Sequence, residues 1–153
     1  TEAEWELTAK GSDVENPRNV PWEGGGRSCH KAIYYTNETL CADKPEPVGT
    51  HPDGNTPEGI SDMAGNVSEW TSNAFDESAY SFAHDLNMDY SYEAKEDDPP
   101  VLKRKVIRGG SWKDIGYYLQ TGTRTYEYQD TAKSYIGFRN VMTYLGRAKG
   151  DDI

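Results

Sequence analysis

Two acidic side chains flank a turn in residues 59–70, which read GISDMAGNVSEW. Asp62 and Glu69 lie on either side of Gly65 and Asn66, and a Gly-Asn pair is typical of a turn because both residues tolerate a positive φ. A chain that folds back here brings Asp62 toward Glu69 and leaves carbonyl groups of the turn free. Carboxylates and loop carbonyls are the ligands of calcium, which takes about six to eight oxygens. The turn therefore predicts a calcium site, with a solvated turn carrying two surface acids as the alternative, since no EF-hand pattern is present.

Two arginines end short apolar runs further along the chain. Arg108 follows Val106 and Ile107, and Arg139 ends the run IGFR. We expect these arginines to pair with buried carboxylates, in a bidentate manner where the geometry allows. The alternative is that both are surface residues at ordinary strand ends.

The first ten residues predict a helix that precedes the turn. Thr1 is an N-cap with Glu4 three residues later, which is a capping box, and Gly11 ends the helix. Trp5 and Ala9 give this helix an apolar side, which we expect to face the core.

Short stretches of alternating or apolar residues predict strands. From residue 67 the chain places Val67, Glu69 and Thr71 on one face, as a strand requires. Pro21 and Trp22 are expected to dock against the core. Further strands are expected at residues 32–35, from residue 106, at 123–128 and at 136–142.

The composition indicates one loop-rich α+β domain. The chain has 153 residues, of which 35% are hydrophobic, with 15 Gly, 8 Pro and 11 Tyr, a mixture that does not suit a helical bundle. Its net charge of −10 repels phosphate backbones, so we expect no nucleic-acid partner. No apolar run of about 18 residues occurs, so the sequence predicts no membrane-spanning helix.

Two cysteines, Cys29 and Cys41, lie in one loop-like stretch. They form a disulfide if the protein is extracytoplasmic, and they are free or buried thiols otherwise. A zinc site that adds His30 and His51 has suitable ligand types, but the spacing matches no zinc-finger pattern.

Residues 75–100 combine acids with aromatic residues, including Tyr90 and Tyr92. A structured loop of this kind is a natural contact surface because Tyr offers a large area with little loss of entropy. The alternative is an insertion that packs on its own domain.

The motifs above occur in the order found in the formylglycine-generating-enzyme (FGE, sulfatase-modifying factor) family. They are TEAEWE from Thr1, Pro-Trp from Pro21, DMAGNVSEW from Asp62, RGGSW from Arg108 and GFR from Gly137. The resemblance spans nearly the whole chain and implies an irregular C-type-lectin-like fold with short antiparallel strands and long loops. We expect residues 1–153 to be a single FGE-like domain whose N-terminal part, with any signal sequence and lipid-anchored Cys, lies upstream.

The resemblance also implies a metal site and the loss of a catalytic one. Where the family binds calcium through a side-chain oxygen, two backbone carbonyls and a Glu, this chain has Asp62, Gly65, Val67 and Glu69. The enzymes bind copper(I) through two cysteines after Gly-Gly-Ser, and the matching positions here hold Asp114 and Leu119. Copper(I) prefers soft thiolates, so we expect no catalytic residues and no oxidase activity.

Within the family, residues 103–124 and 126–139 look most like PorK and GldK, lipoproteins of type IX secretion and gliding motility. This resemblance implies a non-catalytic subunit of a homo-oligomeric ring, built with a PorN/GldN-like partner in the periplasm, at the inner leaflet of the outer membrane. Membrane attachment would then be through a lipid anchor outside this sequence. The alternatives are an FGE-like oxidase and a lectin-like ligand-binding module.

Overall fold

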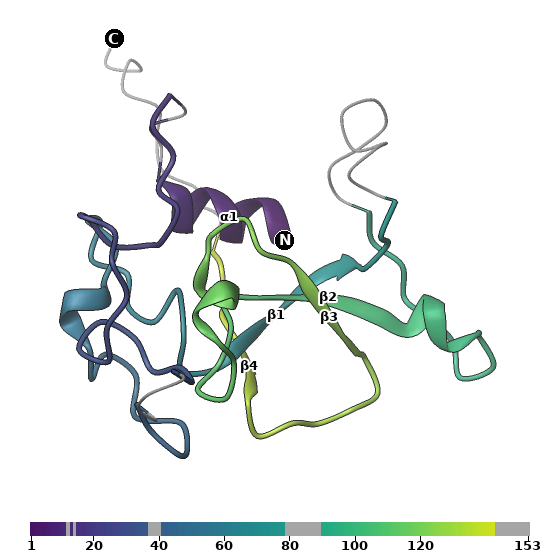
Figure 1. The fold of residues 1–153 in the computed structure, drawn as a ribbon. Helices are drawn as coiled ribbons and strands as arrows, with labels where there is room; N and C mark the ends of the chain where they lie inside the picture. Colours follow the sequence, from purple (N-terminus) through teal and green to yellow (C-terminus); the bar gives the residue numbers. More distant parts are fainter. Residues whose placement is uncertain (12, 14, 37–40, 79–89, 143–153) are drawn as a thin grey trace, which may run out of the picture.

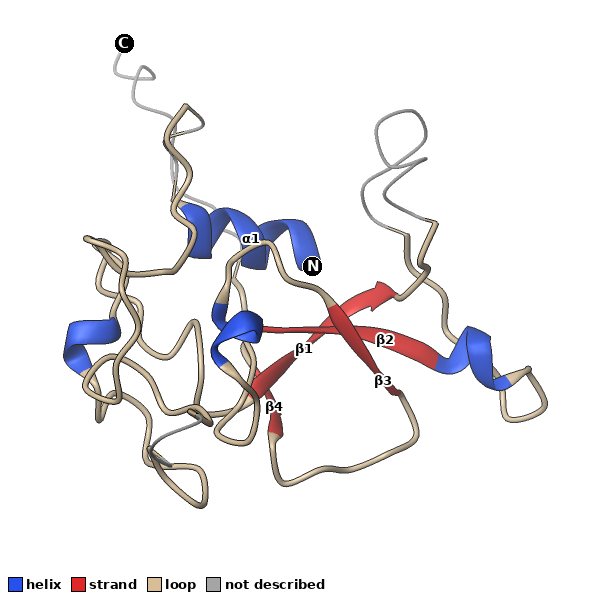
Figure 2. Ribbon diagram, in the orientation of Figure 1, coloured by secondary structure: helices blue, strands red, loops and turns tan. Residues whose placement is uncertain are grey.

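The computed structural model describes the chain except for residues 12, 14, 37–40, 79–89 and 143–153. The described residues form one α-helix, a four-stranded sheet and long loops with three short 3-10 helices (Figure 2). The elements in chain order are α1 Glu2–Lys10, η1 Pro52–Gly54, β1 Ser68–Ala74, η2 Pro100–Lys103, β2 Arg104–Arg108, η3 Gly116–Leu119, β3 Thr125–Tyr128 and β4 Ile136–Phe138. Helix α1 packs against β1 and β2, and the described loops between α1 and β1 gather at one end of the sheet (Figure 1).

Helix α1 begins and ends where the sequence predicts. The Thr1 hydroxyl accepts a hydrogen bond from the backbone N–H of Glu4, and the Glu4 carboxylate accepts one from the Thr1 amino group, which completes the capping box. Gly11 has a φ of 83° and donates its N–H to the Leu7 carbonyl. Trp5 and Ala9 are buried, so the predicted helix and its apolar side are confirmed.

The sheet has the order β3-β2-β1-β4 and combines both strand directions. Strand β1 is antiparallel to β2, with Glu69 opposite Arg108, and parallel to β4, with Glu69 opposite Gly137. The expectation of antiparallel strands alone is therefore wrong for the β1–β4 pair. Because Gly137 lies next to Glu69, the chain after β4 returns Arg139 to the turn that precedes β1.

Two apolar clusters form the core, and each contains one residue of the turn. The larger consists of Val20, Trp22, Ala32, Tyr34, Ala64 and Leu119, and the smaller of Trp5, Ala9 and Met63. Trp22 is buried in the larger cluster, which confirms that the Pro-Trp pair docks against the core. Ala64 and Met63 thus anchor the turn in both clusters.

Two of the predicted strands differ from the structure. Residues 32–35 form no strand, and an isolated bridge joins Tyr35 to Ile115 instead, because the backbone here bonds to loops, with the Ile33 carbonyl accepting the N–H of Asn66. The strand predicted at 136–142 ends at Phe138. Its partner β1 becomes irregular after Trp70, so the pairing has no straight strand to continue along.

The two cysteines form a disulfide in the structure. Cys29 and Cys41 have Cα atoms 5.2 Å apart, within the range a disulfide requires. Both sulfurs are consumed by this bond, so the zinc alternative loses its thiolate ligands. Within the described part of the chain, no group of three or more His, Cys, Asp or Glu side chains is arranged to hold a metal ion.

The described flanks of the 75–100 segment pack on the sheet. Lys105 is buried and its Nζ donates to the Tyr92 carbonyl (2.8 Å) and to Glu93 Oε1 (2.8 Å), while the Ala74 N–H bonds to the Tyr90 carbonyl. Residues 79–89 lie outside the described residues, so the contact surface expected there stays a prediction. No helix in the described ranges is long and apolar enough to cross a membrane.

Candidate functional site

The turn at residues 59–70 has the backbone that its sequence predicts. Asp62, Gly65 and Asn66 have φ values of 55°, 79° and 63°. A Cβ atom on Gly65 would lie 2.6 Å from the Ile33 carbonyl oxygen, so no other residue fits there. The Asn66 side chain holds the neighbouring loop by accepting from the Glu46 N–H (2.9 Å) and donating to the Glu46 carbonyl (3.0 Å).

Glu69 is the buried carboxylate at the end of this turn. Arg139 Nε lies 3.1 and 3.0 Å from its two oxygens, and Arg139 Nη2 donates to Oε1 at 2.7 Å. The indole N–H of Trp5 donates to Oε2 at 2.8 Å. The side chains of Glu69 and Arg139 are 8% and 28% exposed, which confirms the prediction that Arg139 pairs with a buried carboxylate.

Arg139 also bonds to the backbone of the turn. Its Nη2 donates to the carbonyls of Ser61 (2.9 Å) and Asp62 (3.2 Å). The carboxylate of Asp62 has a separate partner, because its Oδ2 accepts the N–H of Gly49 at 2.7 Å. The fold therefore brings both ends of the turn to Arg139, while the two acidic side chains of the predicted site have different partners.

A calcium ion that used Glu69 as a ligand would share this carboxylate with Arg139. The ion would then lie beside the Arg139 guanidinium, and a divalent ion about 4 Å from a unit positive charge is repelled by about 8 kcal/mol at an effective dielectric constant of 20. Of the other predicted ligands, Gly65 is buried in the turn and Val67 packs on Gly137. Calcium binding by Asp62, Gly65, Val67 and Glu69 stays a prediction that a titration decides.

Arg108 is the centre of a second buried charge cluster. Its side chain has no exposed surface and donates to Glu2 Oε1 (2.9 Å), Glu6 Oε2 (2.6 Å) and the Thr121 carbonyl (2.6 Å). Arg124 binds both oxygens of Glu2, at 2.6 and 2.8 Å. The prediction that Arg108 pairs with carboxylates is confirmed, and its partners Glu2 and Glu6 lie four residues apart on α1.

Asp114 and Leu119 both have structural partners. Asp114 Oδ2 accepts the backbone N–H (3.0 Å) and the hydroxyl (2.6 Å) of Ser111, and the Asp114 carbonyl accepts the N–H of Tyr35 (2.8 Å). Leu119 ends η3 and has no exposed surface in the larger apolar cluster. These contacts fix the chain after β2 against the loop around residue 35.

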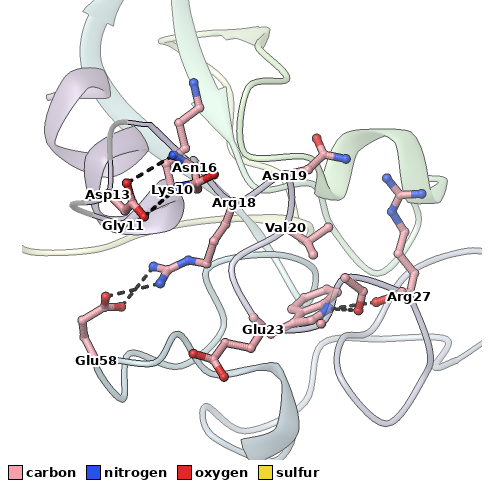
Figure 3. Close-up of a pocket in the computed structure, with 14 residues that line it drawn as sticks. Lys10, Gly11, Asp13, Asn16, Arg18, Asn19, Val20, Glu23, Arg27 and Glu58 are labelled. Atoms are coloured by element: carbon pink, nitrogen blue, oxygen red, sulfur yellow. Dashed lines mark hydrogen bonds and ion pairs between the residues drawn. The ribbon is translucent and has the colours of Figure 1, made fainter.

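A cavity of about 550 Å³ lies between the C-terminal end of α1 and the loops that follow it (Figure 3). Arg18 crosses it and binds both oxygens of Glu58 (3.0 and 3.3 Å) as well as carbonyls at the end of α1. These hydrogen bonds lower the pKa of Glu58 to about 2. Trp22 forms part of the wall, with its indole N–H donated to the carbonyls of Gly25 and Gly26.

Two polar side chains at this cavity have no protein partner among the described residues. Figure 3 places the Asn19 amide and the Arg27 guanidinium on the same side of the cavity, near Val20. The triplet Gly24–Gly26, which runs between Trp22 and Arg27 with positive φ throughout, leaves open space beside this cation. The sequence reasoning missed this cavity, for which the Gly-Gly-Gly run was the available signal.

The comparisons with known proteins identify the family. Residues 1–144 match the family model described as the sulfatase-modifying factor enzyme 1-like domain, FGE-sulfatase. The chain belongs to the FGE-sulfatase family. Two of its relatives are the serine/threonine-protein kinases Pkn1 of Chlamydia trachomatis serovar L2 and of Chlamydia pneumoniae, each 32% identical over 143 residues. Each match covers 91% of this chain and 20% of the kinase, so the chain spans about a fifth of these relatives.

Solved structures resemble this chain in fold. Treponema denticola variable protein 1 is 27% identical with a TM-score of 0.61, and the match covers 90% of this chain and 44% of that protein. PvdO from Pseudomonas aeruginosa is 24% identical with a TM-score of 0.62, covering 90% of this chain and 49% of PvdO, a likeness of fold alone. The predicted α+β class and family are thus confirmed.

Proposed function

We propose that this FGE-sulfatase domain is a non-catalytic structural module. The observation that carries the proposal is the state of the two positions where the resemblance places copper-binding cysteines: Asp114 is bonded to Ser111, and Leu119 is buried in the core. The two cysteines of the chain are joined to each other, and a disulfide offers no thiolate to copper(I). That the domain makes up about a fifth of the kinases it matches supports a module that serves other parts of longer proteins.

A direct assay tests whether the domain lacks copper-dependent oxidase activity. The purified domain should bind copper(I) weakly and should leave a Cys-containing sulfatase peptide unchanged in mass. Turnover of that peptide by the wild type, abolished by Asp114→Asn, would show that Asp114 is catalytic and that the proposal is wrong.

The assembly we propose is the periplasmic ring of type IX secretion, formed with a PorN/GldN-like partner. Its support is the similarity of residues 103–124 and 126–139 to PorK and GldK, a segment that contains β2, η3, β3 and β4. The disulfide suits a compartment outside the cytoplasm, such as the periplasm at the inner leaflet of the outer membrane. A C-type-lectin-like arrangement of the sheet and loops belongs to the same proposal.

Electron microscopy of the full-length protein with its genomic neighbour tests this assembly. We expect rings when both proteins are present and smaller species when the neighbour is omitted. A monodisperse full-length protein that neither forms rings nor co-purifies with a PorN-like partner would contradict the ring assignment while leaving the non-catalytic proposal intact.

A ligand-binding module is the second candidate, and the cavity of Figure 3 favours it. Arg27 and Asn19 supply donors that match a carboxylate. Titration of succinate into the protein, followed by NMR, should perturb the amides of residues 24–27, and Arg27→Gln should weaken the affinity at least about tenfold. Lys133→Gln, which removes an exposed cation outside the cavity, is the matched control.

A further inference from the structure

Six of the described residues that line the cavity of Figure 3 are charged, and four of them have protein partners. The paired side chains are Lys10 with Glu6, Asp13 with Asn16, and Arg18 with Glu58. The other two, Glu23 and Arg27, have no partner among the described residues. One carboxylate and one guanidinium in the same cavity are therefore available to a ligand.

Glu23 and Arg27 lie on either side of the glycine triplet, which is anchored to the core. Trp22 is buried, and its Nε1 donates to the carbonyls of Gly25 (3.0 Å) and Gly26 (2.8 Å). All three glycines have a positive φ, which turns the chain sharply between the two charged residues. The two free charges thus extend from the ends of a turn that a core residue holds in place.

The aliphatic part of Arg27 is positioned by packing. A Cβ atom on Gly116 would lie 3.1 Å from Arg27 Cδ, so this side chain passes directly over Gly116. A long charged side chain can pack in this way while its head stays in water. Figure 3 shows the Arg27 guanidinium apart from the Glu23 carboxylate, with Val20 between them in this view. The two charges are therefore separated within the cavity.

We propose that this cavity binds a small zwitterion whose ammonium and carboxylate groups are several atoms apart, with Arg27 as the carboxylate site and Glu23 as the ammonium site. The inference rests on the ligand-binding candidate proposed above and names its ligand class. An α-amino acid is too short, because one carbon carries both of its charged groups. A dianion is repelled by the net charge of −10, whereas a zwitterion has no net charge. The cavity volume of about 550 Å³ suits a small molecule.

Titration of triglycine into the full chain, followed by the NMR signals of the amides of residues 24–27, tests this proposal. Triglycine carries an ammonium group at one end and a carboxylate at the other, so we expect saturable shifts. N-acetyl-triglycine lacks the ammonium group, and triglycine amide lacks the carboxylate. Each should bind the wild type at least about tenfold more weakly than triglycine.

Two variants assign the two charges to their sites. Glu23→Gln should weaken triglycine at least about tenfold and leave N-acetyl-triglycine unchanged, because that peptide has no ammonium group to lose its partner. Arg27→Gln should weaken triglycine by a similar factor and leave triglycine amide unchanged. Glu96→Gln removes an exposed acid outside the cavity and should not change any of these affinities.

The results separate this inference from the ligand-binding candidate on which it rests. Equal affinities of the wild type for triglycine and N-acetyl-triglycine would overturn the zwitterion, as would a Glu23→Gln variant that binds triglycine like the wild type, while both leave carboxylate binding at Arg27 intact. Shifts with succinate but none with triglycine would have the same meaning. The absence of shifts with either compound would contradict the ligand-binding candidate as well. Both variants should keep the wild-type Tm, because the two side chains are exposed, and the blocked peptides on the wild type decide the proposal if a variant does not fold.

Discussion

At the scale of single residues, buried arginines connect segments that are distant in sequence. Arg108 faces two carboxylates of α1 and lies 5.0 Å from the centre of the Trp5 ring, a cation–π contact. Removing one member of a buried ion pair is costly because the remaining charge stays desolvated. Arg139 likewise connects the end of β4 to the turn at residues 59–70 and to Glu69. The two arginines therefore determine how α1, the turn and the sheet fit together.

Substituting Arg108 should therefore destabilise the domain strongly. Arg108→Met removes the hydrogen bonds to Glu2, Glu6 and the Thr121 carbonyl, while Glu2 keeps Arg124 and Glu6 keeps Lys10. We expect a loss of about 2 kcal/mol in the free energy of unfolding, measured by urea denaturation. Arg27→Met is the matched control, because Arg27 is exposed and has no protein partner among the described residues, and it should change stability by less than about 0.5 kcal/mol. Equal effects of the two substitutions would contradict the importance of the cluster.

The Arg18–Glu58 pair predicts a dependence of stability on pH. Hydrogen bonds from Arg18 lower the pKa of Glu58 from 4.5 to about 2. Because the pKa is lower in the folded state, the pair stabilises the fold above about pH 4.5, and this contribution is lost as the pH falls toward about 2. The Glu58 side chain is 51% exposed, so solvent screening limits the contribution to less than about 1 kcal/mol.

Urea denaturation of the wild type and of Glu58→Gln at a series of pH values measures this effect. The wild type should be the more stable protein at neutral pH, and the difference in the free energy of unfolding should shrink across the window from 4.5 to about 2. A difference that stays constant across that window would show that the pair does not shift the titration of Glu58.

At the scale of elements, the sequence predicted what depends on local chemistry. The capping box places α1 to the residue, and the Gly-Asn pair predicts the turn before β1. The strand expected at 32–35 failed because a tertiary contact, the bond from Asn66 to Ile33, decides that backbone. The length of β4 depends on an irregularity in β1, which no pattern within 136–142 reveals.

The same distinction between local sequence signals and tertiary contacts applies to the candidate site. The pairing of Arg108 and Arg139 with carboxylates was predictable from arginines that end apolar runs. Their partners could not be predicted, because Arg108 lies 106 residues from Glu2 and 102 residues from Glu6, and Arg139 lies 70 residues from Glu69. The disulfide likewise depends on the distance between the Cα atoms of Cys29 and Cys41, which their spacing in the sequence does not determine.

The 3-10 helix η1 shows how close approach of two loops fixes an element. A Cβ atom on Gly54 would lie 1.7 Å from the Lys31 carbonyl oxygen, a distance that forces the loops apart. We expect Gly54→Ala to lower the free energy of unfolding by more than about 2 kcal/mol. Gly122→Ala is the control, because a Cβ there meets no atom within 4 Å, and it should be neutral or slightly stabilising. Similar unfolding curves for both variants would contradict the close approach.

At the scale of the whole molecule, the proposed assembly depends on the charge and on the exposed aromatic side chains. A net charge of −10 keeps free copies apart, and neutral aromatic side chains supply contact area that a partner can cover. The structure separates an exposed tyrosine from a packed one. Tyr117 is 58% exposed, whereas Tyr126 is half-buried, with its ring 4.8 Å from that of Phe75 and under the Arg104 guanidinium.

The difference between these two tyrosines gives a test of the proposed ring. Tyr117→Ser removes exposed aromatic area, so we expect an unchanged Tm and at least a tenfold weaker co-purification of the PorN-like partner with the full-length protein. Tyr126→Ser removes a ring that packs in the domain, so we expect a Tm lower by several degrees. If Tyr117→Ser retains the partner fully while the wild type forms rings, the interface lies on another face of the domain. If Tyr126→Ser has the same Tm as the wild type, the packing of the Tyr126 side chain against Phe75 and Arg104 does not stabilise the fold.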